Sequence, residues 1–415
     1  MPAPSSTSAC VAAAPLHAAS VRPLRLPPQA AFYLQASITL AFLAGSSAPT
    51  PLYAIYRAEW GFSATMLTLV FAVYALAVLA SLLVGGRLSD HIGRRPVLLA
   101  ATLAQAVTMF LFADASGLAD LLVARVVQGL SAGAALAAVG AGLLDLDKSR
   151  GAVANSVAPM LGTALGAGVA GLLVQFLPAP TQLVYALFGA VFVAQAIGVW
   201  FMDETALPRP GALASLRPQI GVPAPQRGVL LRIAPAVVAV WALAGFYASL
   251  GPMLVRDLLD SRSVLLGGLS LFVLAGSGAL AVLLLTRREP RALMRLGMLA
   301  LIAGLATVLV ALGLRSITLF LIGTAIAGIG FGTGFQGALR TLVAGIAASD
   351  RARVLSVLFV VAYVAMGAPA VLAGLDVAVH GDIVGTARAF AGVVMALAAL
   401  AWLGVPRAEM TPRPA

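Results

Sequence analysis

One short segment decides how the rest of the sequence is interpreted, and it reads Gly86-Arg87-Leu88-Ser89-Asp90-His91-Ile92-Gly93-Arg94-Arg95-Pro96. It lies between two long apolar runs, at 65–84 and 97–113. Its glycines permit a tight turn between neighbouring helices, and Asp90 can accept hydrogen bonds from the arginines or from amides at a helix start. We therefore expect a short basic turn that joins two membrane-spanning helices.

The composition of the whole chain places those helices in a membrane. Of its 415 residues, 61% are hydrophobic and 10% are charged, with a mean hydropathy of +1.01. Soluble proteins contain about 45–50% apolar and about 25% charged residues, so a soluble core could not hide this much apolar surface. This composition excludes collagen-like, disordered, disulfide-stapled and nucleic-acid-binding proteins. Cys10 is the only cysteine, so no intrachain disulfide can form.

Twelve apolar runs are long enough to cross a bilayer, and each must be helical because lipid offers the backbone no hydrogen-bond partner. They are at 31–51, 65–84, 97–113, 118–144, 153–177, 182–202, 231–252, 264–285, 293–313, 316–343, 354–375 and 383–404. A proline- and arginine-rich gap divides them six and six. We expect a disordered cytoplasmic tail (1–29), an N-terminal six-helix bundle (30–202), a cytoplasmic linker (203–229), a C-terminal six-helix bundle (230–405) and a cytoplasmic tail (406–415).

The distribution of basic residues tests this count independently. With the N-terminus inside, twenty of the 26 Lys and Arg residues fall in inside loops or tails and one, Arg125, falls within a span. The five in outside loops are Arg57, Arg256, Arg262, Arg315 and Arg388. Such an excess is typical of cytoplasmic loops, and a miscounted span would scramble it. It also accounts for the net charge of +11 without a nucleic-acid partner.

The two halves resemble each other at an offset of about 200 residues, which indicates duplication. The correspondences pair Phe71 with Phe272, Arg94-Arg95 with the basic loop at 287–295, Gly129…Gly133 with Gly330…Gly334, and Ser156-Val157 with Ser356-Val357. The expected fold is therefore an all-α membrane protein with twelve transmembrane helices in two pseudo-symmetric six-helix bundles.

The segment between the second and third spans resembles the motif G-x-L-x-D-x-x-G-R-R/K of the major facilitator superfamily. The matching residues are Gly86, Leu88, Asp90, Gly93, Arg94 and Arg95. The resemblance implies the superfamily's twelve-helix fold, secondary transport by alternating access, and a conformational-gating role for this loop. An ordinary basic membrane loop would explain the arginines, but it would not explain Asp90 and the glycines.

In the fourth span, Arg125, Gln128 and Gly129 are similar to the R-x-x-Q-G pattern of the same superfamily. A full charge inside a span costs at least about 2.5 kcal/mol on insertion scales, so it is a candidate functional group. The resemblance implies a role in substrate binding or proton transfer. The alternative is an arginine near the outer end of a long helix that extends its charge to the membrane surface.

The fifth span carries Gly162, Gly166 and Gly168, a pattern that resembles the antiporter signature G-P-x-x-G-G, with Thr163 in place of the proline and Ala167 in place of the second glycine. The resemblance favours export. Small residues at this spacing also let helices pack closely in lipid whatever the function, so a purely structural role is the alternative.

In the superfamily fold, the first, second, fourth and fifth helices of each half line a central cavity. Aromatic side chains with a polar tip suit an amphipathic organic substrate. The candidates on these spans are Gln35, Tyr53, Tyr74, Asn155, Trp241, Tyr247, Gln336 and Tyr363. No histidine or acid falls deep in a span, so coupling to protons is implied by the resemblance alone.

We expect a secondary active transporter of a small organic solute that exports drug-like compounds or metabolites in exchange for protons. A proton-coupled uptake symporter of a small metabolite is the alternative, and a channel is a remote one. The expected partners are a small-molecule substrate, protons and the lipid bilayer, with no cofactor, metal, enzymatic activity or nucleic acid. The expected protein is a monomer in the plasma (inner) membrane with both termini in the cytoplasm.

Overall fold

The computed structural model describes residues 25–259, 263–344, 346–347 and 350–404. The tail expected at 406–415 and most of the tail expected at 1–29 lie outside these residues. Twelve of the described helices are long and apolar enough to cross a membrane, which confirms the predicted number of spans. Elsewhere the described residues form short helices and turns and contain no strand.

The first half contains α1 (Pro28–Ser47), α2 (Pro49–Trp60), α3 (Ala64–Gly85), α4 (Ser89–Ile92), α5 (Arg94–Ala113), α6 (Leu118–Leu146), α7 (Lys148–Phe176) and α8 (Pro180–Trp200). The short α9 (Ala212–Ser215) follows. The second half contains α10 (Ala224–Ser249), α11 (Gly251–Leu259), α12 (Val264–Leu284), α13 (Pro290–Leu314), α14 (Ile317–Val343), α15 (Arg351–His380) and α16 (Ile383–Gly404). Helices α2 and α11 extend the first span of each half.

Two helices begin earlier than the sequence pattern predicted. Helix α1 begins at Pro28, inside the expected tail, and α10 begins at Ala224, inside the expected linker of 203–229. Both begin with proline in the first turn, where its fixed φ suits a helix and its missing N–H costs nothing. Pro28 and Pro225 are therefore at helix starts. The linker is correspondingly shorter.

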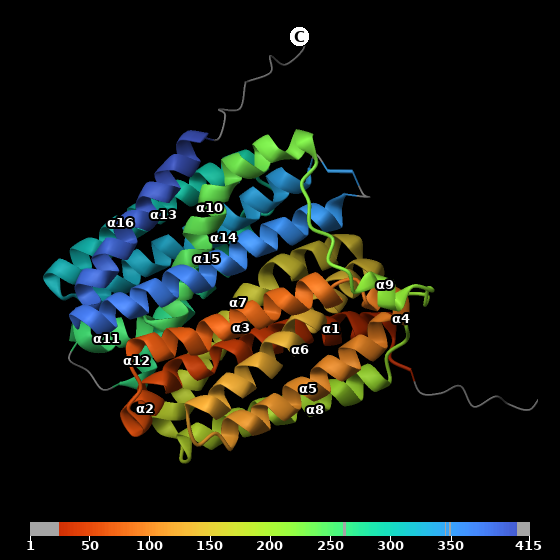
Figure 1. The fold of residues 1–415 in the computed structure, drawn as a ribbon, viewed down its shortest axis with the longest axis horizontal. Coiled ribbons are helices and arrows are strands. Elements are labelled where there is room, and N and C mark those ends of the chain that lie inside the picture. The colour runs from red at the N-terminus through yellow and green to blue at the C-terminus, as the bar shows by residue number, and fades with distance from the viewer. Residues whose placement is uncertain (1–24, 260–262, 345, 348–349, 405–415) are drawn as a thin grey trace, which may run out of the picture.

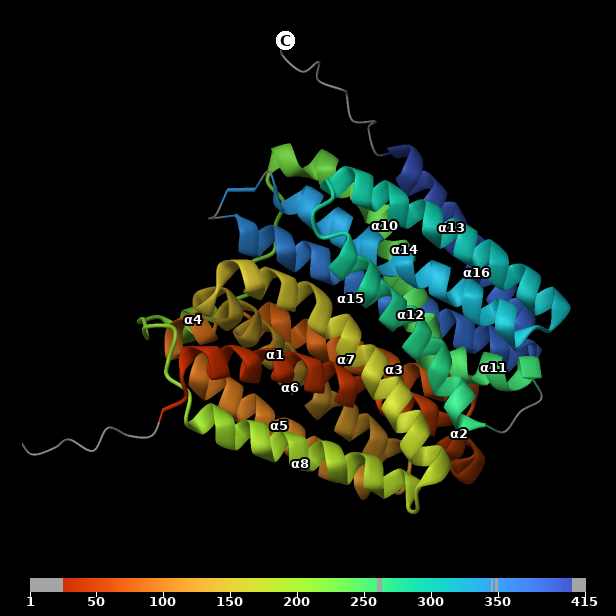
Figure 2. The same cartoon turned by 180° about the vertical axis from the view of Figure 1, so that it is seen from behind.

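The helices form two bundles that lie side by side (Figure 1), with α1, α3, α5, α6 and α8 in one and α10, α13, α14, α15 and α16 in the other. Helices α7 and α12 pack together across the boundary between the bundles, as do α3 and α15. The reverse view shows α7 and α12 running alongside each other (Figure 2). Both contacts join a second-span helix of one half to a fifth-span helix of the other.

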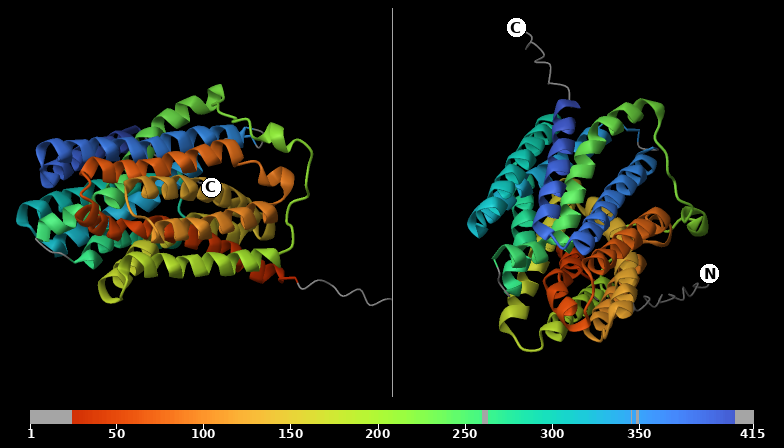
Figure 3. Two further views of the ribbon diagram at one scale, coloured as in Figure 1. Left: turned by 60° about the horizontal axis from the view of Figure 1, so that its bottom comes forward. Right: turned by 60° about the vertical axis from the view of Figure 1, so that its left-hand side comes forward.

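The molecule has two distinct ends along the helix axes. The loop end carries the 86–93 turn and α9, and the far end carries α2 and α11 (Figures 1 and 3). The bundles are bonded to each other at the far end, where Arg57 donates to the Met253 sulfur at 3.1 Å and the Thr65 hydroxyl donates to the Gly374 carbonyl at 3.2 Å.

The packing of the glycines corrects one detail of the repeat. Gly129 and Gly133 hold α6 against α3, because a Cβ at Gly133 would lie 2.6 Å from the Ser81 Cβ. In the second half the glycines that hold α14 against α12 are Gly328 and Gly332, not the expected Gly330 and Gly334. Gly330 instead faces α13, since helix α14 is packed by glycines on two sides.

Candidate functional site

The turn between α3 and α5 is built around one buried arginine. The Arg94 side chain is 9% exposed, and its guanidinium contacts the Asp90 carboxylate, the Ser89 hydroxyl at 2.8 Å and the Asp145 carboxylate at 3.3 Å. Gly93 permits the turn with a φ of 101°, a value that favours glycine. Asp90, Gly93 and Arg94 therefore act as one unit, and Asp145 at the end of α6 joins them.

Glu204, which closely follows α8, also belongs to this loop, although the sequence pattern did not select it. Its carboxylate accepts the backbone N–H groups of Arg94 at 2.7 Å and Arg95 at 3.0 Å, at the start of α5. An acid at a helix N-terminus satisfies donors that have no partner within the helix. The linker is also bonded to the loop where the Arg209 N–H donates to the His91 carbonyl at 2.8 Å.

Arg95 points elsewhere and has an equivalent in the other half. Its guanidinium lies over the Trp200 ring at 5.4 Å and donates to the Trp200 carbonyl. In the second half, Arg295 lies over the Trp402 ring at 5.3 Å. Arg95 and Arg295 occupy equivalent positions about 200 residues apart, and so do Trp200 and Trp402. They give the duplication a structural counterpart.

Arg125 is fully buried inside the first bundle. It donates to the Ser46 carbonyl at 2.9 Å and to Gln128 Oε1 at 2.5 Å, and it contacts the Tyr53 hydroxyl. The possibility that it extends to the membrane surface is therefore wrong, because the aromatic and amide side chains around it hold the charge inside. Among the described residues no carboxylate pairs with it, and its Nε has no hydrogen-bond partner.

Three aromatic rings surround this guanidinium. The rings of Tyr53, Tyr74 and Phe112 have centroids 5.6, 5.3 and 5.5 Å from its central carbon. Ring faces attract a cation electrostatically, and more strongly where water is excluded. The environment thus holds a charge in the bundle without a carboxylate that would neutralise it.

Gly129 completes the R-x-x-Q-G pattern for a packing reason. A Cβ on this residue would lie 2.5 Å from the Ala77 Cβ and 2.7 Å from the Tyr74 carbonyl oxygen, both on α3. Its absence lets α6 approach α3 closely. The glycine thereby brings Tyr74 beside Arg125, one turn away on α6.

The second bundle contains a matching aromatic cluster. Trp241 lies 5.1 Å from Tyr363 and 5.4 Å from Phe335 between ring centroids. The Trp241 Nε1–H is buried without a hydrogen-bond partner among the described residues. Helix α15, which carries Tyr363, packs on α3, which carries Tyr74, so the cluster lies on a helix that contacts the first bundle.

The other cavity candidates do not join these clusters. Gln35 is buried in the first bundle beside Met202, and Tyr247 hydrogen-bonds Thr324 at 2.9 Å inside the second. Gln336 donates to Ser156 at 2.9 Å and so bridges α14 and α7 towards the loop end. Asn155, next to Ser156 in sequence, donates to the Gly140 carbonyl at 2.9 Å and is half-buried.

The glycines of the fifth span pack helices together. Gly162 and Gly166 face α1, with a Cβ at Gly162 placed 3.0 Å from the Leu43 Cβ, and the Ser47 hydroxyl donates to the Thr163 carbonyl at 2.9 Å. Gly168 faces Phe272 of α12 across the two bundles, where a Cβ would lie 2.7 Å from the ring. The observed contacts of these glycines are helix-packing contacts.

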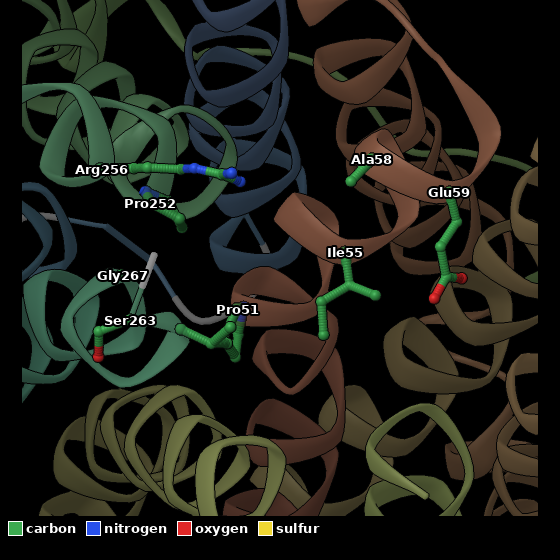
Figure 4. A pocket seen from close by; sticks show the side chains of 9 residues that line it. Pro51, Ile55, Ala58, Glu59, Pro252, Arg256, Ser263 and Gly267 are labelled. Atoms are coloured by element: carbon green, nitrogen blue, oxygen red, sulfur yellow. The ribbon is translucent and has the colours of Figure 1, made fainter. Parts of the chain in front are cut away.

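A cavity of about 220 Å³ lies at the far end between the two bundles. The first bundle contributes Ile55 and Glu59, and the second contributes Arg256 and Gly267, which lie on opposite sides of it (Figure 4). The sequence patterns did not select these residues. Oppositely charged groups thus face the same opening from the two halves.

Comparisons with known proteins agree with this architecture. The sequence matches the family described as Major Facilitator Superfamily over residues 36–370. It is 29% identical over 319 residues to the multidrug resistance protein MdtL of Klebsiella pneumoniae, covering 70% of this chain and 76% of that one. It is 28% identical over 148 residues to the quinolone resistance protein NorA of Staphylococcus aureus, covering 35% and 38%.

Among solved structures, the nucleoside transporter NupG and a mutant form of it share the fold. The mutant form superposes with a TM-score of 0.68 at 12% identity, over 90% of this chain and 99% of that chain, and the unmutated form superposes with a TM-score of 0.65 at 13% identity. At this identity the likeness concerns the fold alone. The twelve helices, the duplicated halves, the basic turn and the family match over most of the chain lead to one conclusion: this protein belongs to the Major Facilitator Superfamily of transporters.

Proposed function

We propose that this transporter exports small organic compounds, drug-like molecules or metabolites, in exchange for protons. The loop end faces the cytoplasm, so both termini and the 203–223 linker are cytoplasmic and the helices span the plasma (inner) membrane as a monomer. The excess of basic residues at the loop end supports this orientation. The two halves alternate about the contacts between α3 and α15 and between α7 and α12.

One observation carries the proposal that the cargo is a small organic molecule. Each bundle holds a buried N–H donor without a partner among the described residues, Arg125 Nε in one and Trp241 Nε1 in the other, and each donor lies among aromatic rings. Unpartnered buried donors are costly, and they are uncommon unless a ligand or water uses them. Aromatic rings beside an unused donor suit a flat organic molecule that carries acceptor atoms.

The named relatives support the direction of transport. MdtL and NorA are named for multidrug resistance and for quinolone resistance, and a transporter that exports a drug would confer resistance to it. The coupling to protons rests on the superfamily resemblance. Arg125 takes part in substrate binding, because its positive charge favours an anionic or acceptor group beside it.

The gating loop carries the conformational change. Arg94 binds two carboxylates of the first half, Asp90 and Asp145, so its position fixes the start of α5 relative to the end of α6. A rearrangement of these ion pairs biases the protein towards one of its two states, because bonds made in only one state shift the population.

The experiment uses everted membrane vesicles with an inside-acid gradient and a fluorescent quinolone, a flat molecule with carboxylate and carbonyl acceptors, as the probe. We expect the probe to accumulate in vesicles that contain the protein and to leave when nigericin collapses the gradient. Gradient-driven loss of the probe would instead indicate uptake symport. Flux that neither saturates nor shows counterflow would indicate a channel.

A pair of tryptophan variants then tests the site. Trp241→Leu should raise the KM for the probe about tenfold, since it removes one ring and one donor, each a contribution of about 0.5–1.5 kcal/mol. Trp402→Leu is the control, because Trp402 stacks on Arg295 at the loop end and away from the cluster. Equal KM values for the two variants would remove Trp241 from the binding site.

A further inference from the structure

A second, smaller cavity lies at the loop end of the second bundle, where α10, α13, α14 and α16 come together. Its volume is about 50 Å³, so it admits a compact group of about one or two water volumes. The residues that line it are Val229, Arg232, Ile233, Arg291, Met294, Thr341 and Gly404. The cavity is separate from the Arg125 and Trp241 clusters.

Two arginines bring uncompensated charge to this cavity. The side chains of Arg232 from α10 and Arg291 from α13 make no hydrogen bond or ion pair with the described residues. Glu289, the acid nearest to Arg291 in sequence, caps α13 by accepting the Ala292 N–H at 3.3 Å. The cavity therefore has two guanidinium groups whose donors are available to an anion.

The loop end of the first half also contains arginines, but there the buried arginine is paired with acids. Unpaired arginines are therefore not required at this end of a half. Arg94 is neutralised there by Asp90 and Asp145, and the sequence offset that aligns Arg95 with Arg295 places Met294 at the position of Arg94. At this end the first half has Asp90, Asp145, Asp147, Asp203 and Glu204, whereas the described residues of the second half have Glu289 and Asp350. The second half is thus left strongly basic.

Two exposed apolar side chains are next to lining residues of this cavity in the sequence. Leu231 on α10 is 74% exposed and Leu403 on α16 is 71% exposed, and both adjoin lining residues in sequence. Arg295 stacks on Trp402 at the same end, and amphipathic aromatic side chains favour the boundary between lipid and water. A charged recess beside exposed leucines matches a molecule with a phosphate at one end and hydrocarbon at the other.

We propose that this cavity binds the phosphate of an anionic phospholipid headgroup. Arg232 and Arg291 donate to the phosphate oxygens, and the acyl chains run along Leu231 and Leu403. Basic pockets between transmembrane helices are suited to such headgroups because the phosphate supplies the missing counter-charge. The bound lipid ties α10 to α13 at the loop end.

The test titrates dioleoyl phosphatidylglycerol into the delipidated full-length protein and counts bound lipid by native mass spectrometry. The Arg232→Gln/Arg291→Gln variant should bind the lipid at least tenfold more weakly. Gly404→Leu keeps both charges and adds bulk to a lining residue, and among the described residues the one atom within 4 Å of a Cβ there is the Arg232 carbonyl oxygen at 3.9 Å. It should weaken binding to a similar degree.

The matched control is Arg287→Gln/Arg288→Gln, which removes the same charge from the adjacent loop outside the cavity. Its affinity should stay within about twofold of the unmodified protein. A control that weakens binding as much as the test variant would overturn the proposal in favour of diffuse attraction. Equal binding of dioleoyl phosphatidylcholine, or displacement of the lipid by inorganic phosphate at equal concentration, would also overturn it.

Discussion

The two carboxylates that hold Arg94 should compensate for each other, and this can be measured. Asp90→Asn or Asp145→Asn alone leaves the guanidinium with one carboxylate. The two acids are 47% and 36% exposed, so each charge-assisted contact is weakened by solvent and each single change should cost about 1 kcal/mol. Asp90→Asn should therefore insert and fold, and its loss of transport would report on gating.

The double variant Asp90→Asn/Asp145→Asn should cost about 3–5 kcal/mol, more than the sum of the single changes. The reason is that Arg94, only 9% exposed, is then left buried without a counter-charge. The measurement is the free energy of unfolding of the purified protein from SDS titration followed by circular dichroism. The excess over additivity is the quantity that matters.

Asp203→Asn is the control for this cycle. Asp203 is 70% exposed and pairs with Arg25 at 3.4 Å, so its loss should change stability by less than about 0.5 kcal/mol. If the double variant costs only the sum of the two single variants, the two carboxylates do not share Arg94 and the description of the loop as one unit is refuted.

Three other changes follow from the contacts. Gly129→Ala should lower the free energy of unfolding by about 1–3 kcal/mol because its Cβ would meet α3, whereas Gly140→Ala, with its nearest contact at 3.8 Å, should raise it by up to about 1 kcal/mol; thermal melting compares them. Arg125→Lys should reduce probe transport at least about a hundredfold despite its retained charge, since an ammonium cannot make the same planar contacts; near-normal flux would contradict its role. Glu204→Gln should speed hydrogen–deuterium exchange of the Arg209 amide, which donates to the His91 carbonyl, because the linker loses its bond to the start of α5; an unchanged exchange rate would contradict this.

The sequence determined the membrane helices, their number and the basic turn. These follow from short-range physics, because an apolar run in lipid must satisfy its own backbone and arginine must stay outside hydrocarbon. The duplication was also visible in the sequence, but the exact pairing of glycines between the two halves was not. Glycines at 328, 330, 332 and 334 cannot be distinguished in the sequence, because they differ only in which helix they face. The first turns of α1 and α10 were missed because proline both ends and begins helices.

The site depended on tertiary structure. Arg125 and Gln128 are near in sequence, but the sequence could not show that Tyr53 and Phe112 close around the charge, or that the charge is wholly buried. Glu204 lies more than one hundred residues from the amides it binds. Such contacts are set by how helices pack against each other, and that packing depends on which small residues allow close approach.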